Sequence, residues 1–477
     1  MRKPFYYLLA AVLALGPALI VPARGADGID LAGTWAGKLS LPAGELELVF
    51  RIERGDDGTY AARMDVPAQG ATGIPVSRVS CGDGAVRLEV ASINGLFEGS
   101  PGAGADEIAG AWKQNGVSLP LVLRRTAQAP ALRRPQEPKP PFPYSSEEVV
   151  FTADKAGIRL AGTLTLPGTG APFPAVILIT GSGPQDRDET ILGHRPFLVL
   201  ADYLTRRGIA VLRVDDRGVG GSTGSLDEAT TSDLADDVLA GAAYLRTRKE
   251  IDPARVGLIG HSEGGLIAPL AAVRAKDLAC LVLLAAPGLP GEEIICRQTA
   301  LILKAAGADD KLISRETGLQ RRLFAVVKGE KDDQTARERL ALIYREYLKA
   351  LTDEERQALG EIEAYIAGQT RMLLTPWFRF FLTYDPIPAL RQVECPVLAL
   401  NGVKDLQVPC EDNLGAIEAA LREGRTRDYT VKRLPDLNHL FQTCRTGHPA
   451  EYGLIEETLA PQVLETVGDW LASRFGL

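Results

Sequence analysis

The sequence is poor in the residues that build metal centres and disulfide frameworks, since its 477 residues include only four histidines and six cysteines. Six cysteines are too few for a disulfide scaffold in a chain of this length. Positive charge is not in excess either, because 53 lysines and arginines face 61 aspartates and glutamates, for a formal net charge of −8. Without a general basic surface to meet phosphate groups, we expect no nucleic-acid partner, and small neutral substrates remain open.

Long apolar runs are equally scarce, and the one that stands out lies at the N-terminus, over residues 5–21. Two basic residues precede this run and small residues at positions 23 and 25 follow it, which is the pattern of a cleavable signal peptide. A transmembrane anchor needs about 20 uninterrupted apolar residues, whereas Gly16 and Pro17 interrupt the run. We therefore expect a signal peptide over residues 1–25, a secreted or periplasmic mature chain, and no stable membrane anchor.

Alternation of apolar and polar residues predicts a small all-β domain over residues 27–125. The alternation is strict at residues 86–90, as expected for a half-buried strand. Trp35 and Trp112 end two similar segments, each near the start of a strand. We interpret them as rings that close the core, and the alternative is a ligand platform, for example for sugars. A proline-rich linker, residues 126–148, follows the domain.

The catalytic part of the chain is expected in residues 149–477, where apolar strand-like runs alternate with helical stretches. This order predicts an α/β fold with a mainly parallel sheet and helices on both faces. Two extended segments before the first buried strand are expected to add an antiparallel edge. The buried strands are predicted at residues 175–180, 210–214, 256–259, 280–286 and 396–400. The long, charged, helix-favouring interval 288–390 predicts a helical cap inserted over one end of the sheet.

A candidate nucleophile follows the predicted strand at residues 256–259, in the segment Gly260-His261-Ser262-Glu263-Gly264-Gly265. A Gly-x-Ser-x-Gly pattern between a buried strand and a helix is typical of a nucleophile elbow. The small residues two before and two after the serine let strand and helix approach, and the tight turn exposes the hydroxyl. We predict Ser262 as the nucleophile.

A serine nucleophile needs a base and an orienting acid, which on this architecture follow it in the order acid, then histidine. His439 lies just past the predicted last strand and is the expected base, with His448 as a surface residue. Asp405 comes a few residues after the strand at 396–400 and is the expected acid. Asp412 fits a helix-capping role better, because it precedes a helix.

The oxyanion hole is expected to combine backbone N–H groups from two loops. One is the N–H of Glu263, the residue after the nucleophile. The other comes from the loop that follows the strand at 175–180, with Ser182 favoured and Gly183 second.

Acidic residues surround the same site. Asp186 and Asp188 could suggest a metal pair, but no histidine accompanies them, and ion pairs with Arg187 that fix the loop are the expected role. The glycine-rich segment 215–222 lacks the spacing of a phosphate-binding loop and is interpreted as a structural turn near the site.

Two further features concern the cap and the loops. Trp377, Phe378 and Phe381 form a dense aromatic patch at the end of the cap interval, in a chain with 6% aromatic residues. They could line an acyl pocket, pack the cap onto the sheet, or do both. Cys410 and Cys444 each lie five residues after a predicted catalytic residue, and this symmetry suggests a disulfide between them.

Together these motifs resemble the α/β-hydrolase superfamily, and more narrowly bacterial exported esterases with an N-terminal β domain and a helical cap. The resemblance spans about residues 27–477. By this resemblance, Ser262, Asp405 and His439 form a catalytic triad and the substrates are short-chain carboxylic esters. The segments that carry it are residues 181–189, 216–218, 260–265, 401–405 and 437–442.

The sequence thus predicts a serine esterase that acts on small-molecule esters and uses neither a metal nor an organic cofactor. A peptidase of similar fold is the first alternative, and it would need a fixed acidic group for the substrate's amino terminus. The second alternative is an envelope carbohydrate-binding protein whose hydrolase half is vestigial. Acyl-chain length, the alcohol and the oligomeric state are left open by the sequence.

Overall fold

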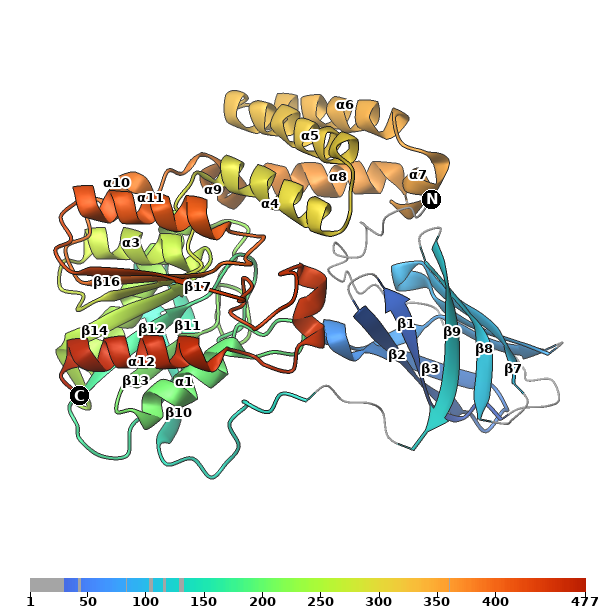
Figure 1. The fold of residues 1–477 in the computed structure, drawn as a ribbon, viewed down its shortest axis with the longest axis horizontal. Helices are drawn as coiled ribbons and strands as arrows, with labels where there is room; N and C mark the ends of the chain where they lie inside the picture. Colours follow the sequence, from blue (N-terminus) through green and yellow to red (C-terminus); the bar gives the residue numbers. More distant parts are fainter. Residues whose placement is uncertain are drawn as a thin grey trace.

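The computed structural model describes residues 30–477 except 42–43, 83, 103–105, 115–116, 128–132 and 360. The predicted signal peptide, residues 1–25, lies outside the described residues. Two separate sheets organise the chain, one in an N-terminal β domain and one in a larger α/β domain (Figure 1). Among the described residues, no helix combines the length and the apolar character that crossing a bilayer requires.

The N-terminal domain is a single nine-stranded antiparallel sheet, as the alternating pattern predicts. The strand order is β4-β3-β2-β1-β9-β8-β7-β6-β5. The first strand in the sequence, β1, therefore pairs with the last, β9, at the centre of the sheet. The strands are β1 Gly33–Leu41, β2 Gly44–Arg54, β3 Tyr60–Val66, β4 Ala71–Val76, β5 Arg78–Gly82, β6 Ala85–Val90, β7 Gly95–Pro101, β8 Glu107–Gln114 and β9 Val117–Thr126.

The two tryptophans of this domain lie inside its core. Trp35 is 0% exposed and Trp112 is 4% exposed. Trp112 packs against Phe50, whose ring also contacts Phe97. Because both indoles are buried, the ligand-platform alternative does not hold, and the rings contribute apolar burial that stabilises the sheet.

The α/β domain is built on an eight-stranded sheet with the order β10-β11-β13-β12-β14-β15-β16-β17. From β13 to β17 neighbouring strands are parallel, while β11 is antiparallel to both β10 and β13, so the predicted antiparallel edge is confirmed. The strands are β10 Ser145–Ala153, β11 Ile158–Leu166, β12 Phe173–Ile179, β13 Ala210–Val214, β14 Ile251–His261, β15 Leu281–Leu284, β16 Val397–Gly402 and β17 Tyr429–Leu434.

Helices cover both faces of this sheet and create two apolar layers (Figure 1). On one face pack α2 (Thr231–Thr247), α3 (Gly264–Arg274) and α11 (Cys410–Glu423). On the other pack α1 (Pro196–Arg206) and α12 (Pro461–Phe475). Strands buried on both faces read as continuous apolar runs, which is why the sequence reveals them so clearly.

A helical cap occupies the chain between β15 and β16 and has its own apolar core, which includes Phe324, Tyr344 and Phe378. Asp309 and Asp332 cap the N-termini of two of its helices by accepting backbone N–H groups, a stabilising arrangement. The cap helices are α4 Gly291–Ala305, α5 Asp310–Gly329, α6 Asp333–Lys349, α7 Asp353–Ala358, α8 Ile362–Leu373, α9 Pro376–Thr383 and α10 Ile387–Leu390.

The predicted disulfide between Cys410 and Cys444 is wrong. Both cysteines are free thiols. The Cys410 Sγ faces the carbonyl oxygen of Asn401, and the Cys444 Sγ faces that of Asp436, 3.5 Å away. Each thiol behaves as a small buried side chain, so equal spacing from two predicted catalytic residues did not imply contact.

The two domains meet through short 3₁₀ helices, η1 (Pro67–Gln69) in the β domain and η3 (Pro449–Leu454) in the α/β domain. Their backbones are in direct contact, because a Cβ atom on Gly453 would lie 1.4 Å from the carbonyl oxygen of Ala68. Leu454 packs against the core of the β domain. In the linker, Arg134 donates hydrogen bonds to the carbonyl oxygens of Gly453 and Ile455.

The variant Gly453→Ala is therefore expected to destabilise the domain junction. Its new methyl group can be accommodated only if one backbone moves, and overpacking of this kind costs about 1 to 3 kcal/mol. Thermal unfolding should show a Tm lowered by several degrees, since about 1 kcal/mol corresponds to roughly 2 to 4 °C in domains of 150 to 250 residues.

Gly415→Ala is the matched control for this prediction. Gly415 lies inside α11, and a Cβ atom there would meet nothing within 4 Å. Because alanine favours a helix more than glycine does, its Tm should stay unchanged or rise. Equal Tm values for Gly453→Ala and the parent would contradict the junction described above.

Candidate active site

Ser262 lies at the sharp turn between β14 and α3, in a backbone conformation that serine rarely adopts. Its φ is +51°, in the left-handed region. Its N–H donates to the carbonyl oxygen of Leu284 at 2.8 Å, and its own carbonyl accepts the N–H of Gly265. Such strain persists only where the surroundings over-determine it, and it clusters at functional sites.

Three glycines allow this turn, because side chains at their positions would collide with neighbouring backbone or side chains. A Cβ atom on Gly260 would lie 2.1 Å from the Gly264 carbonyl oxygen, and one on Gly264 would lie 2.2 Å from that of Ile179. At Gly265 it would meet the Cβ of Ala286 at 2.2 Å. The Gly-x-Ser-x-Gly-Gly pattern is thus a steric requirement of the close approach of β12, β14 and α3.

His439 and Asp405 are in direct contact at the carboxyl edge of the sheet. His439 follows β17 and Asp405 follows β16. The His439 Nδ1 donates to the Asp405 Oδ2 at 2.8 Å, and both side chains are buried. The other carboxylate oxygen, Oδ1, accepts the N–H groups of Gln407 and Val408, each at 2.8 Å. Because the carboxylate holds the proton on Nδ1, Nε2 is the nitrogen able to accept one.

The loop of His439 also reaches the nucleophile turn. The His261 Nε2 lies 3.0 Å from the His439 carbonyl oxygen, and the two imidazole rings have centroids 5.0 Å apart. His261 immediately precedes Ser262. The structure therefore joins His439 to Asp405 directly and to the Ser262 turn through its neighbour.

The predicted oxyanion groups lie around the same turn. Gly181 packs against Ser262, since a Cβ atom on Gly181 would be 3.3 Å from the Ser262 Cβ. Burial raises the pKa of the Glu263 carboxylate, and the nearby Ser182 side chain lowers it slightly, so the two loops lie close together. Within the described part of the chain, the backbone N–H groups of Ser182, Gly183 and Glu263 have no protein acceptor.

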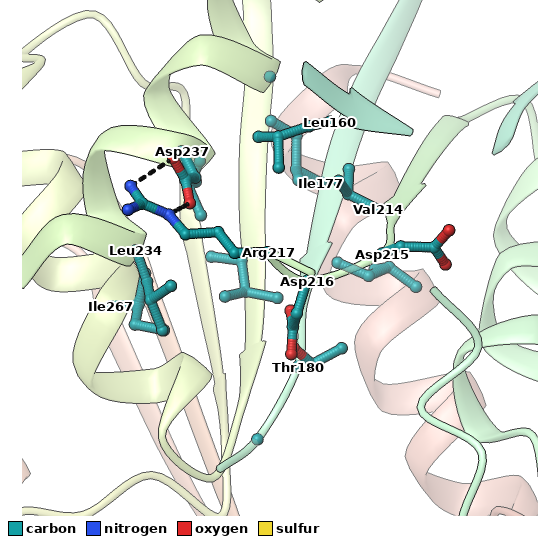
Figure 2. A pocket seen from close by; sticks show the side chains of 15 residues that line it. Leu160, Ile177, Thr180, Val214, Asp215, Asp216, Arg217, Leu234, Asp237 and Ile267 are labelled. Atoms are coloured by element: carbon teal, nitrogen blue, oxygen red, sulfur yellow. Dashed lines mark hydrogen bonds and ion pairs between the residues drawn. The ribbon is translucent and has the colours of Figure 1, made fainter. Parts of the chain in front are cut away.

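Asp216 holds the loop that contributes Ser182 and Gly183, which gives the turn at 215–222 a structural role. Its Oδ1 accepts the Thr180 hydroxyl at 2.8 Å and its Oδ2 accepts the Gln185 N–H at 3.0 Å, so both ends of the loop are anchored. Figure 2 shows Asp216 pointing toward Thr180, whereas Arg217 turns away to pair with Asp237. Burial, reinforced by nearby Glu189 and Glu263, raises the pKa of Asp216 to about 7.

The charged residues at 186–188 fix their loop, but not by pairing with one another. Arg187 binds Asp215 at 2.7 Å. Asp188 pairs with the buried Arg213, and Asp186 accepts the N–H groups of Asp188 and of a neighbouring residue. The predicted ion pairs of Asp186 and Asp188 with Arg187 are therefore wrong. Adjacent side chains in an irregular loop point toward different elements, so Arg187 and Asp188 pair with residues outside the segment.

The aromatic patch divides between two environments. The Trp377 Nε1 donates to the Glu263 Oε1 at 2.8 Å, and its ring stacks on Phe381 with centroids 5.4 Å apart. Phe378, from the same helix α9, instead packs on Phe324 inside the cap core. Trp377 therefore reaches Glu263 beside the Ser262 turn with Phe381 stacked on it, while Phe378 serves the packing of the cap.

Sequence reasoning gave no role to the side chains of Glu189 and His261, which are buried between the three loops of the site. Glu189 ends the segment 181–189 and His261 lies in the Gly-x-Ser-x-Gly segment. This position inside a motif is the only feature of the sequence that could have pointed to them. Their contact joins residues 72 positions apart, and no periodicity or spacing encodes such a pairing.

Asp216 generates a pH-dependent prediction. Its folded pKa of about 7 exceeds the ordinary 3.8, so between these values the native state binds more protons at this site than the unfolded chain does. Its contribution to the free energy of unfolding must therefore fall as pH rises from about 4 to about 7. Asp216→Asn removes this contribution, so the Tm difference, variant minus parent, should be more positive at pH 8 than at pH 5.

The measurement is thermal unfolding of both proteins across that range. Asp65→Asn is the control, because it removes a buried carboxylate of the β domain without touching residues 180–185. A Tm difference for Asp216→Asn that stays constant or falls between pH 5 and pH 8 would contradict the assignment.

Comparison with known proteins identifies the family. A family model described as the alpha/beta hydrolase family matches residues 176–452. Esterase EstD of Thermotoga maritima is 27% identical over 332 residues, which cover 69% of this chain and 68% of EstD. Esterase FrsA of Yersinia pestis is 32% identical over 164 residues, or 33% of this chain and 37% of FrsA. Among solved structures, Est1E from Butyrivibrio proteoclasticus with bound ferulic acid aligns with a TM-score of 0.40 and 18% identity, over 69% of this chain and 100% of Est1E. The extent of the family match shows that this chain belongs to the alpha/beta hydrolase family.

Proposed function

We propose that the chain is a serine esterase that cleaves short-chain carboxylic esters through an acyl-enzyme intermediate. The observation that carries the proposal is the buried hydrogen bond between His439 and Asp405, on a loop docked against the strained turn of Ser262. Membership of a hydrolase family supports it, and two similar proteins, EstD and FrsA, are named esterases.

In the proposed acylation step, the Ser262 Oγ forms a bond to the ester carbonyl carbon while its proton passes to the His439 Nε2. The carbonyl oxygen becomes an oxyanion, which accepts hydrogen bonds from the N–H of Glu263 and from that of Ser182 or Gly183. Asp405 stays ionised and stabilises the imidazolium. Preorganised N–H donors need no reorganisation during the reaction, which is why each contributes about 10² to 10³ in rate.

The tetrahedral intermediate then collapses. Its bond to the alcohol oxygen breaks as the imidazolium of His439 gives its proton to that oxygen, and the acyl group remains on Ser262. In the second half, His439 takes a proton from water while the water oxygen attacks the acyl carbon. Protonation of the Ser262 Oγ by the imidazolium releases the carboxylic acid and restores the enzyme.

The preference for short acyl chains rests on the position of the cap. The hydrogen bond from Trp377 to Glu263 holds the indole beside the residue that follows the nucleophile, and Phe381 stacks behind it. In this proposal the two rings bound the acyl site and restrict the length of the acyl group that it accepts.

Substitution of the nucleophile tests the proposal. Ser262→Ala should lower kcat for p-nitrophenyl butyrate by about 10⁵ to 10⁶-fold, because the acyl-enzyme cannot form. Parallel assays with aminoacyl anilides distinguish the esterase from the peptidase alternative, and we expect turnover of the esters only. Ester turnover within tenfold of the parent in Ser262→Ala would refute the assignment.

The two aspartates after β16 offer a matched pair of variants. Asp405→Asn should lower kcat by about 10⁴-fold with little change in KM, because the amide no longer fixes the tautomer of His439. Asp412→Asn should leave both constants unchanged, since Asp412 is exposed and pairs with Arg297 on the cap. Equal kcat values for the two variants would argue against Asp405 as the acid.

The acyl preference can be tested separately. Trp377→Ala should raise the ratio of kcat/KM for octanoyl over butyryl esters by about tenfold or more, because each additional buried CH₂ contributes about 0.8 kcal/mol. Met372→Ala, an exposed change on α8, is the control and should not alter this ratio. An unchanged ratio in Trp377→Ala would show that the ring does not limit the acyl site.

A further inference from the structure

A second acid–histidine pair, Glu189 and His261, lies buried beside the proposed triad. Glu189 is 4% exposed and His261 is 7% exposed. The Glu189 Oε1 lies 2.8 Å from the His261 Nδ1 and also accepts the N–H of Gly181 at 2.7 Å. Glu189 itself has a left-handed backbone, with a φ of +52°. A buried carboxylate in a strained backbone indicates a position that the surrounding structure dictates.

Hydrogen-bond chemistry fixes the direction of these contacts. The His261 Nε2 faces the His439 carbonyl oxygen at 3.0 Å, and since a carbonyl can only accept, Nε2 must carry a proton. The Nδ1 in turn shares a hydrogen bond with the Glu189 Oε1, so both nitrogens of the ring are engaged. Burial lowers the pKa of His261, but the charge of Glu189 and its hydrogen bond outweigh this effect and hold the pKa above its ordinary value, with a smaller contribution from Asp405.

The pair therefore connects three loops that sequence separates widely. Gly181 belongs to the loop of the oxyanion donors, His261 directly precedes the nucleophile, and the carbonyl of His439 belongs to the proposed base. The Glu189 Oε1 contacts both the Gly181 N–H and the His261 Nδ1, and the His261 Nε2 bonds the His439 carbonyl oxygen. Phe441, two residues after His439, packs edge-on against the His261 ring.

We propose that Glu189 and His261 are positioning residues that hold the oxyanion loop and the base loop in register around Ser262. The proposal rests on the serine-esterase function proposed above. Neither residue exchanges a proton with the substrate. Loss of the pair lets the Gly181 backbone and the His439 backbone move relative to the nucleophile, and a misplacement of about 1 Å can cost about 10²-fold in rate.

The test is a double-mutant cycle on steady-state kinetics with p-nitrophenyl butyrate. Glu189→Ala and His261→Phe should each lower kcat by about 100-fold and change KM by less than about threefold. Because the two residues act as one unit, the double variant should be no slower than the slower single variant. Glu189→Gln keeps an oxygen acceptor for the Gly181 N–H and should recover kcat to within about tenfold of the parent.

Asp65→Asn provides the matched control. Asp65 is also a buried carboxylate that accepts a backbone N–H, from Gly73, and pairs with an arginine, but it lies in the β domain. This variant should lower the Tm and leave kcat unchanged. If Glu189→Ala lost activity only to the extent that Asp65→Asn does, the loss would reflect stability and the proposal would fail.

Three other results also overturn it: kcat for Glu189→Ala within threefold of the parent, single effects that multiply in the double variant, or no recovery in Glu189→Gln. If Glu189→Ala does not fold, His261→Phe decides by the same kcat criterion. Ser262→Ala, assayed alongside, separates the two proposals. Full turnover in that variant rejects the esterase mechanism, whereas its inactivity together with an active Glu189→Ala rejects only the positioning role.

Discussion

The close approach of β12, β14 and α3 at the Ser262 turn is the constraint on which the rest of this site depends. Gly260, Gly264 and Gly265 leave no room for a side chain, and only this approach brings the end of β12 against Ser262, the proposed nucleophile. The left-handed backbone of Ser262 carries a strain of about 1 to 3 kcal/mol. The fully buried strands β12 and β15 on either side of β14 pack against the turn and hold it in that state.

Sequence patterns predicted the parts of this molecule that local physics encodes. Strands buried on both faces, the glycine-flanked serine and the order of Asp405 and His439 after it all leave marks along the chain. Sequence patterns do not reveal the direction in which an individual side chain points. Arg187 pairs with Asp215 and not with its own neighbours, and Cys410 does not meet Cys444. The contact between Glu189 and His261 was missed for the same reason, since it depends on how loops fold over the sheet.

The β domain is connected to the active site by a short structural route. Its η1 helix contacts η3, and the Tyr452 hydroxyl of η3 accepts a hydrogen bond from Gln407 at 3.1 Å. The N–H of Gln407 in turn binds Asp405. His194 lies on the other side of η3 and bonds the Tyr452 carbonyl. The β domain contacts the hydrolase domain through this junction. Tyr452 therefore takes part both in the packing of the two domains and, through Gln407, in the placement of Asp405.

Covalent labelling with a fluorophosphonate followed by peptide mass spectrometry tests the central claim most directly, because the reagent reacts preferentially with a serine activated by a neighbouring base. The account predicts one stoichiometric adduct, on the peptide that contains Ser262, and loss of labelling when His439 is replaced by alanine. An unlabelled protein, or an adduct on another residue with Ser262 unmodified, would contradict it.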